Sequence, residues 1–312
     1  MRRGAGHRGT LLRGAPRRHR RRARALSALP DPPRRELEAR LGPVRGSSPV
    51  GGGSINHAAR VELATGPVFV KHSDTAPPGS FAAEADGLRA LAEAGSGLVV
   101  PRVLAVADAF LAMEWLEPAG ESASSAERLG RGVALLHRAS AATWGWDADN
   151  FIATLPQANA PAADWPEFWR ARRLQPLLER ARAAGRAPGS EREWERLWER
   201  LPALLAPAAE DGPSLLHGDL WSGNALSTTA GPALVDPAVY HGHREVDLAM
   251  TELFGGFGAR FHDAYAEAWP LLPGYREERR AVYQLLPLLV HVNLFGGGYV
   301  ARTAEVLRST VR

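Results

Sequence analysis

The 312-residue chain contains no cysteine, which excludes disulfide bonds and any chemistry of a thiol. It also lacks a run of about 18 to 20 apolar residues, the length that a membrane-spanning helix needs, so we expect no membrane contact. Only one of its 38 basic residues is a lysine, Lys71, and the others are arginines. The hydrophobic fraction of 45% indicates a globular protein that is long enough for two lobes with separate cores.

The formal charge of +4 is distributed unevenly. Residues 1–24 hold ten arginines and no acid, and the rest of the chain has 28 basic and 34 acidic residues, a formal charge of −6. The first segment has few apolar residues, so we expect a disordered arginine-rich tail. Contact with nucleic acid or an acidic surface and a transit function are alternatives. We favour an inert extension, or a start site upstream of the true one, and nucleic acid is then an unexpected partner.

The most informative segment is HGDLWSGN at 217–224, which has the order H-G-D-x-x-x-x-N and is followed by Asp236 after a short apolar run. Phosphoryl transfer needs a carboxylate for the proton of the attacking hydroxyl, and metal ions to neutralise the phosphate oxygens. We therefore predict Asp219 as the catalytic base, with Asn224 and Asp236 as ligands of Mg²⁺ that accompanies ATP. Kinase catalytic loops keep the same Asp-to-Asn interval. Gly218, in place of their arginine, favours a small-molecule kinase.

The single lysine supports this interpretation from another part of the chain. Lys71 ends a strand-like run, and Glu84 lies in the first turn of a helix predicted at 80–94. A compact ammonium suits a position between nucleotide phosphates and a helix carboxylate, whereas a guanidinium is a wide planar group. Chance placement of a lone lysine on a strand is the alternative.

Two further segments are predicted to bind the nucleotide. Backbone N–H groups of a glycine-rich turn can approach phosphates, and backbone groups of the hinge between lobes could bind adenine. An ordinary hairpin turn and a solvent-facing strand end are the alternatives. The residues concerned are Gly51, Gly52, Gly53 and Ser54 in the turn, and Glu114, Trp115 and Leu116 in the hinge.

The hydrophobic periodicity predicts an α+β, bilobal protein-kinase-like fold. The nucleotide-binding lobe, rich in strands, is expected at 25–116 and a mainly helical catalytic and substrate lobe at 117–312. Helices are predicted at 34–41, 80–94, 122–138, 245–254, 260–269 and 275–294, and strands across 44–63, 68–71, 99–107 and 110–115. Two tryptophan pairs at i,i+4 spacing, Trp165 with Trp169 and Trp194 with Trp198, are expected to pack within helices. His137 is expected at a helix surface or at the edge of the core.

Several strings resemble the fructosamine kinase (ketosamine 3-kinase) family, a branch of the aminoglycoside-phosphotransferase-like kinases. They are GGGSI at 51–55, GPVFVK at 66–71, MEWL at 113–116, TLPQAN at 154–159, HGDLWSGN at 217–224 and DPAVYHGHREVDLAMTELFGGF at 236–257. The resemblance covers roughly residues 35 to 305. It implies ATP-dependent phosphorylation of a sugar hydroxyl on a ketosamine, free or protein-bound, which permits deglycation. Ser54 stands where family members often have cysteine, so a disulfide-linked dimer is excluded.

The resemblance also implies roles for individual residues. His217 would be structural and Asp247 would brace the catalytic loop, although Asp247 could be a simple charge near a helix N-terminus. Trp221 would offer its ring to the sugar, unless it is a buried structural residue. Asn150, Thr154, Gln157 and Asn159 would line the same cleft. An aminoglycoside or other small-molecule phosphotransferase and a nucleotide-binding pseudokinase are the alternative functions, and a cytoplasmic location is expected.

Overall fold

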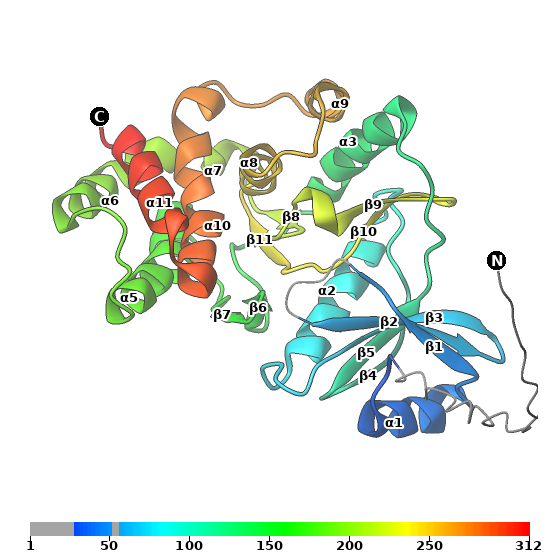
Figure 1. Cartoon of the computed structure of the whole chain (residues 1–312). Helices are drawn as coiled ribbons and strands as arrows, with labels where there is room; N and C mark the ends of the chain where they lie inside the picture. Colours follow the sequence, from blue (N-terminus) through cyan, green and yellow to red (C-terminus); the bar gives the residue numbers. More distant parts are fainter. Residues whose placement is uncertain (1–27, 52–55) are drawn as a thin grey trace, which may run out of the picture.

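The computed structural model describes residues 28–51 and 56–312, which form a lobe built on a β-sheet and a mainly helical lobe (Figure 1). The predictions for residues 1–24 and for Gly52, Gly53 and Ser54 lie outside the described residues. The α+β kinase-like arrangement predicted from the periodicity is confirmed.

A five-stranded antiparallel sheet with the order β1-β2-β3-β5-β4 forms the first lobe. Helices α1 (Asp31–Leu41) and α2 (Ser80–Glu93) cover its two faces, each over a separate apolar core. Side chains alternate between the faces of a strand. Val68 and Val70 therefore point toward the core under α1, and Lys71 points toward α2. The strands are β1 (Gly46–Pro49), β2 (His57–Leu63), β3 (Gly66–His72), β4 (Val103–Ala107) and β5 (Phe110–Glu114).

The second lobe begins after a connecting segment in which the expected boundary at 116/117 falls. Ser122 caps the first helix: its hydroxyl accepts from Ser125 N at 3.1 Å, and the Ser125 hydroxyl accepts from Ser122 N at 3.0 Å. The helices are α3 (Ala123–His137), α4 (Trp165–Phe168), α5 (Gln175–Ala183), α6 (Glu191–Leu205), α7 (Ala208–Asp211), α8 (Glu245–Leu253), α9 (Ala259–Ala268), α10 (Arg280–Phe295) and α11 (Gly298–Thr310). Segments η1 (Trp169–Leu174) and η3 (Tyr275–Arg279) are π-helical.

Aromatic packing holds the helical lobe together. The predicted tryptophan pairs are in contact, with ring centroids 5.5 Å apart for Trp165 and Trp169 and 5.3 Å apart for Trp194 and Trp198. The ring of Tyr283 meets Trp169 edge-on at 5.0 Å and its hydroxyl accepts from Trp165 Nε1 at 3.1 Å. None of the helices in the described part of the chain is long and apolar enough to cross a membrane.

Two pairs of antiparallel strands flank the loops that carry the HGD motif and Asp236. Strand β8 (Ser214–Leu216) pairs with β11 (Tyr240–Gly242), and β9 (Ala225–Thr228) pairs with β10 (Gly231–Leu234). The loop 217–224 leaves β8 and enters β9, and the loop 235–239 runs from β10 back to β11. Because both ends of each loop are fixed by pairing, the two loops lie against each other: Ala238 N donates to His217 O at 2.8 Å and Val235 N to Asn224 O at 3.0 Å.

Several short elements were not predicted from the sequence. Among them, strands β6 (Asn150–Ile152) and β7 (Leu155–Gln157) form a short hairpin, and α11 begins at Gly298, the last of three consecutive glycines. The helix predicted from residue 275 starts instead as the π-helical segment η3.

Candidate active site

Gly218 shapes the HGD loop. Its φ of +81° lies in the left-handed region, and a Cβ at this position would lie 2.0 Å from the carbonyl oxygen of Ala238. No side chain fits there without moving the backbone. The arginine of the usual kinase pattern is therefore excluded by contact with the neighbouring loop.

Asp247, in the first turn of α8, holds the backbone of the same loop by hydrogen bonds. Its carboxylate accepts from His217 N at 2.7 Å and from Gly218 N at 3.0 Å. His137, fully buried on α3, places Nε2 3.1 Å from the same carboxylate and Nδ1 2.8 Å from the hydroxyl of Tyr265. A carboxylate only accepts, so Nε2 is the protonated nitrogen. This role of His137 was not predicted from the sequence.

Asp219 follows the braced segment. Asn224 Nδ2 donates to its carboxylate at 3.2 Å and to its backbone carbonyl at 2.9 Å, which orients the side chain. Burial, together with the charge of Asp236, raises the pKa of Asp219 from 3.8 to about 7. A carboxyl group that titrates near neutral pH is suited to general base catalysis.

Lys71 joins the two lobes. Its ammonium lies 2.8 Å from Glu84 Oε2 on α2 and 3.0 Å from Asp236 Oδ2 in the second lobe. Burial alone would lower the pKa of Lys71, but the two carboxylates outweigh it and raise the pKa, so the ammonium stays charged. Asp236 has a φ of +56°, a left-handed conformation that is strained for a residue with a Cβ.

Of the other residues predicted to bind the nucleotide, Gly51, Glu114, Trp115 and Leu116 belong to the described part of the chain. Gly51 is exposed at the end of β1. Glu114, Trp115 and Leu116 leave β5 in the segment that connects the lobes, where the Trp115 ring stacks on Phe69 with centroids 6.5 Å apart.

Trp221 is 36% exposed, so it is not a buried structural tryptophan. Its indole ring covers Gly223, where a Cβ would lie 2.2 Å from the ring. The ring therefore lies on the surface of the catalytic loop. In the sequence, Trp221 stands between Asp219 and Asn224.

Asn150, Gln157 and Asn159 are buried, and their side chains bond to the protein itself. They lie behind the loop 235–239, on the hairpin β6–β7 and the segment after it. Contact of these residues with substrate stays a prediction, and Thr154 is half-buried in the turn of the hairpin.

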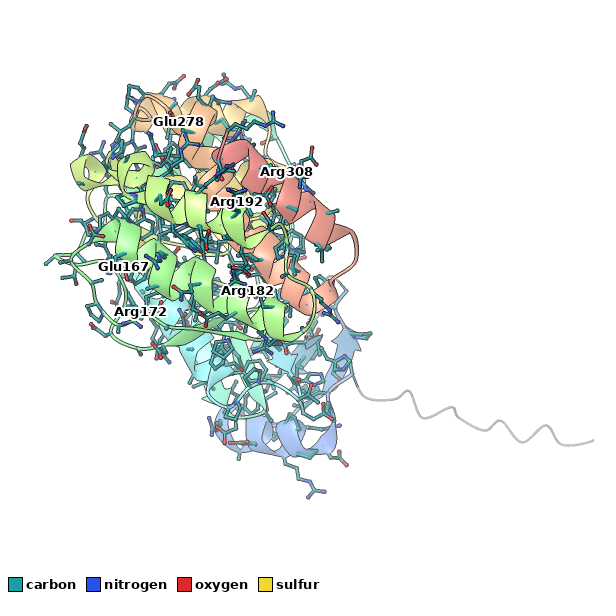
Figure 2. The ribbon with its side chains drawn as sticks, turned by 90° about the vertical axis from the view of Figure 1, so that its left-hand side faces the viewer. Glu167, Arg172, Arg182, Arg192, Glu278 and Arg308 are labelled. Carbon is teal, nitrogen blue, oxygen red and sulfur yellow. The ribbon has the colours of Figure 1, made fainter. Side chains whose placement is uncertain are left out.

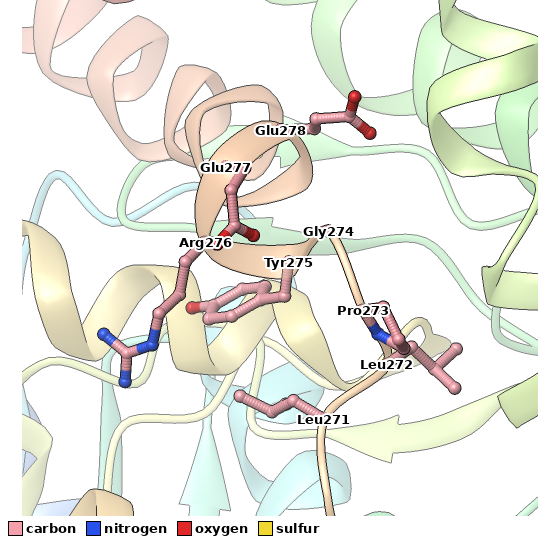
Figure 3. A pocket seen from close by; sticks show the side chains of 8 residues that line it. All are labelled: Leu271, Leu272, Pro273, Gly274, Tyr275, Arg276, Glu277 and Glu278. Atoms are coloured by element: carbon pink, nitrogen blue, oxygen red, sulfur yellow. The ribbon is translucent and has the colours of Figure 1, made fainter.

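Two oxygen-bearing side chains of the site could hold a magnesium ion. In the described ranges, 28–51 and 56–312, no group of three or more His, Cys, Asp or Glu could hold a metal. Asn224 and Asp236 supply oxygen atoms, and magnesium takes one or two protein ligands beside water and phosphate oxygens. A cavity of about 610 Å³ lined by residues 271–278 contains none of these groups (Figure 3).

Comparison with known proteins gives consistent results. The sequence model of the family described as fructosamine kinase matches residues 36–312. A "probable ketoamine kinase" of Synechocystis sp. is 39% identical over 277 residues, covering 84% of this chain and 89% of the relative. The chloroplastic protein-ribulosamine 3-kinase of Arabidopsis thaliana is 34% identical over 302 residues, covering 92% and 90%.

Solved structures show the same relationship. The crystal structure of a candidate fructosamine-3-kinase from Thermobifida fusca is 40% identical, with a TM-score of 0.79, and covers 89% of this chain and 98% of that chain. Aminoglycoside phosphotransferase APH(4)-Ia is 13% identical, with a TM-score of 0.58 over 88% of this chain and 97% of that chain, and shares the fold alone.

Proposed function

The chain belongs to the fructosamine kinase family, and from this premise we propose how its residues phosphorylate a sugar hydroxyl of a ketosamine with ATP. The observation that carries the proposal is that three separate segments meet at one place. Lys71 lies 3.0 Å from Asp236, and Asn224 lies 3.2 Å from Asp219. These are the residue types that phosphoryl transfer requires, placed on both sides of one site.

Asp219 orients the acceptor hydroxyl and takes its proton. The sugar oxygen attacks the γ-phosphorus in line with the departing ADP; the bond to ADP breaks as the new phosphorus–oxygen bond forms, and the hydroxyl proton passes to the carboxylate of Asp219. No covalent enzyme intermediate is needed. The brace by Asp247 keeps the backbone of the loop fixed during the transfer.

Asn224 and Asp236 are the residues that would hold Mg²⁺. Asn224 uses its Nδ2 toward Asp219, which leaves Oδ1 for a cation, and the Asp236 carboxylate is partly exposed. The ion would neutralise charge on the phosphate oxygens. Lys71, fixed by Glu84, adds a second positive charge to the nucleotide side. We place the phosphates near Gly51, Gly52, Gly53 and Ser54, and adenine against the hinge at Glu114, Trp115 and Leu116.

The acceptor is a ketosamine, and the exposed indole of Trp221 is the surface against which we place its sugar. The amine of the ketosamine can belong to a small molecule or to a glycated protein, and the reaction is the same for both. Protein repair by deglycation requires that the enzyme accepts a glycated protein. A cytoplasmic location remains a prediction.

A substrate panel tests the function. Purified protein with ATP and Mg²⁺ is assayed for ADP release with ribulose-, erythrulose- and fructose-amines, on free lysine and on a glycated protein, with an aminoglycoside in parallel. We expect turnover of at least one ketosamine. A larger kcat/KM for the aminoglycoside would favour the alternative phosphotransferase, and absence of turnover with intact nucleotide binding would favour a pseudokinase.

A further inference from the structure

A chain of hydrogen bonds runs through the core behind the loop 235–239. Arg173, on the π-helical segment η1, donates from Nη2 to Asn159 Oδ1 at 2.6 Å. Asn159 donates from Nδ2 to Asn150 Oδ1 at 2.9 Å, and Asn150 donates from Nδ2 to the carbonyl of Val239 at 2.8 Å. The three side chains are 1%, 0% and 6% exposed, so water cannot substitute freely for these bonds.

The chain has one direction, which is fixed by the donors of Arg173 at one end and by the carbonyls of Ala148 and Val239, which accept from Asn159 and Asn150. A guanidinium has only donors, so Asn159 must turn its oxygen to Arg173 and its nitrogen to Asn150. Asn150 must then turn its oxygen to Asn159 and its nitrogen to Val239. Each bond polarises the next in a buried chain of this kind. Gln157 supports the end of the chain by donating to Asn150 Oδ1 at 3.0 Å and to the carbonyl of Ala238 at 3.3 Å.

The carbonyls that receive these bonds belong to the strained part of the site. Ala238 donates its own N–H to His217 O at 2.8 Å and its oxygen closes the space beside Gly218. Asp236, two residues earlier, has its φ at +56°. A strained residue keeps its conformation only where its surroundings over-determine it. Bonds to the carbonyls of residues 238 and 239 supply that constraint on the C-terminal side of Asp236.

Arg173 is an unusual origin for such a chain. Among the ion pairs of the described residues none involves its guanidinium, which instead lies 3.9 Å from the ring centre of Tyr240 and 4.6 Å from that of Phe168. Its Nη1 donates to the carbonyl of Ala158 at 2.6 Å. The charge of Asp149 favours the ionised guanidinium, and its Nη atoms donate to two backbone carbonyls and to Asn159.

We propose that Arg173, Asn159 and Asn150 are positioning residues that hold the segment 236–239 against the HGD loop, and that they do not contact the ketosamine. The proposal rests on the proposed role of Asp236 on the nucleotide side. It gives the TLPQAN string at 154–159 a function in placing Asp236 instead of one in binding the sugar.

The variant Asn159→Asp keeps the volume and the bond from Arg173, and reverses the bond between residues 159 and 150. A carboxylate at 159 pairs with Arg173 but cannot donate to Asn150, so Asn150 turns its amide and its oxygen meets the carbonyl of Val239. Arg173→Met removes the origin of the chain and a buried charge together. Exposed Arg172, on the same segment, provides the matched control Arg172→Met (Figure 2). Melting temperature and circular dichroism establish that each variant is folded.

For each protein we would measure the affinity for ADP by calorimetry, with and without Mg²⁺. The KM for the ketosamine that the wild type phosphorylates most efficiently is measured in parallel. Residues that orient a metal ligand are worth about 10- to 100-fold in metal affinity or activity. We expect both variants to lose about tenfold of the Mg²⁺-dependent gain in ADP affinity, with metal-free ADP binding and ketosamine KM within about twofold of the wild type. The Arg172→Met protein should match the wild type.

Two results would overturn the proposal: a raised ketosamine KM with unchanged ADP binding, which would place these amides in the acceptor site, and no change in any quantity. If Asn159→Asp does not fold, the binding data for Arg173→Met test the proposal. This variant should fold more readily, because methionine introduces no buried charge. Wild-type turnover separates this test from the proposed function. If the wild type binds ADP with Mg²⁺ but phosphorylates no ketosamine, the proposed function is contradicted. The comparison of ADP binding between wild type and variants still tests the positioning role.

Discussion

The ammonium of Lys71 lies 3.0 Å from the carboxylate of Asp236, although Lys71 belongs to the sheet and Asp236 to the helical lobe. The contact sets the distance between the lobes at the position where the nucleotide is expected. Both groups also have a partner or a role on their own side: Lys71 with Glu84, and Asp236 as a proposed magnesium ligand. The geometry of this pair, together with that of the HGD loop, leads to testable predictions.

Replacing Lys71 with arginine should be damaging although the charge is kept. The guanidinium is wider than the ammonium and cannot sit 2.8 Å from Glu84 and 3.0 Å from Asp236 without displacing one of them. A displacement of about 1 Å can cost about 100-fold in rate. We expect kcat/KM for ATP to fall by about that factor. Arg60→Lys on the adjacent strand, where the side chain is partly exposed, is the control. Unchanged ATP kinetics in Lys71→Arg would make Lys71 an ordinary strand residue.

Asp219→Asn should abolish most of the activity and retain nucleotide binding. Loss of a positioned general base costs about 10²- to 10⁴-fold in kcat. An asparagine can still accept from Asn224 through its oxygen, so the loop should keep its conformation. Single-turnover kinetics and calorimetric ATP binding are the measurements. Turnover close to the wild-type rate would remove Asp219 from the mechanism.

The same variant should be more heat-stable than the wild type above neutral pH. The folded-state pKa of Asp219 is about 7 against an ordinary value of 3.8, so the folded protein holds more protons than the unfolded chain between these values. Stability therefore falls as pH rises through this window, and asparagine removes that dependence. We expect a higher melting temperature for Asp219→Asn at pH 8, with a difference that shrinks toward pH 4. An equal change in exposed Asp86→Asn would point to net charge as the cause.

The rate should depend on pH through the same group. Asp219 must be deprotonated to accept the hydroxyl proton, so kcat/KM should rise with pH to a plateau, with its midpoint near 7. The residual activity of Asp219→Asn provides the control, because ionisation of ATP or of the ketosamine amine would persist in it. If kcat/KM rises with pH in the same way in both proteins, the rise reflects ionisation of a substrate and not of Asp219.

Trp221→Ala should weaken the ketosamine and leave the fold and ATP nearly unaffected. The indole is 36% exposed, and contacts of an aromatic ring are worth on the order of 1 kcal/mol. By the relation of about 1.4 kcal/mol per tenfold, that is about a fivefold rise in ketosamine KM. Leu226→Ala, 40% exposed in the strand that follows, is the control. A large drop in melting temperature with both substrates affected alike would contradict a stacking role.

His137→Phe should lower kcat without changing ATP KM. Asp247 would lose a donor and the Tyr265 hydroxyl would lose its acceptor, at about 1–3 kcal/mol of stability for an unsatisfied buried group. The looser brace on His217 and Gly218 would misplace Asp219. His137→Gln keeps an amide donor and should recover part of kcat. A loss of stability with normal kcat would limit His137 to packing.

Local patterns in the sequence were enough to predict the parts of the site that lie on one loop or at the start of one element. The spacing of Asp219 and Asn224 places both on the loop between β8 and β9, and the alternation of β3 directs Lys71 toward Glu84. The contact of Asp236 with Lys71 was not predicted, because it depends on how the two lobes pack against each other. Trp221 could not be assigned to surface or core, because spacing carries no information on burial.

Residues that act through contacts between distant elements were beyond such reasoning. His137 lies in an apolar helical pattern, and nothing in that pattern indicates that α8 brings Asp247 to its ring. Asn150, Gln157 and Asn159 stand out as polar residues of a specific string, but their direction depends on how a short hairpin packs against residues 238 and 239. Helix α11 was missed because it begins at the last of three consecutive glycines, and its packing on α10 outweighs their low helix propensity.

The contact between Gly218 and Ala238 has a consequence for control of the enzyme. In protein kinases, arginines that bind a phosphorylated activation loop allow a second kinase to switch the first one on. Position 218 is sterically closed to an arginine, and the brace by Asp247 already orders the loop through uncharged backbone groups. The conformation of the catalytic loop is thus set by contacts within the chain, without an arginine at position 218 that could bind a phosphorylated segment.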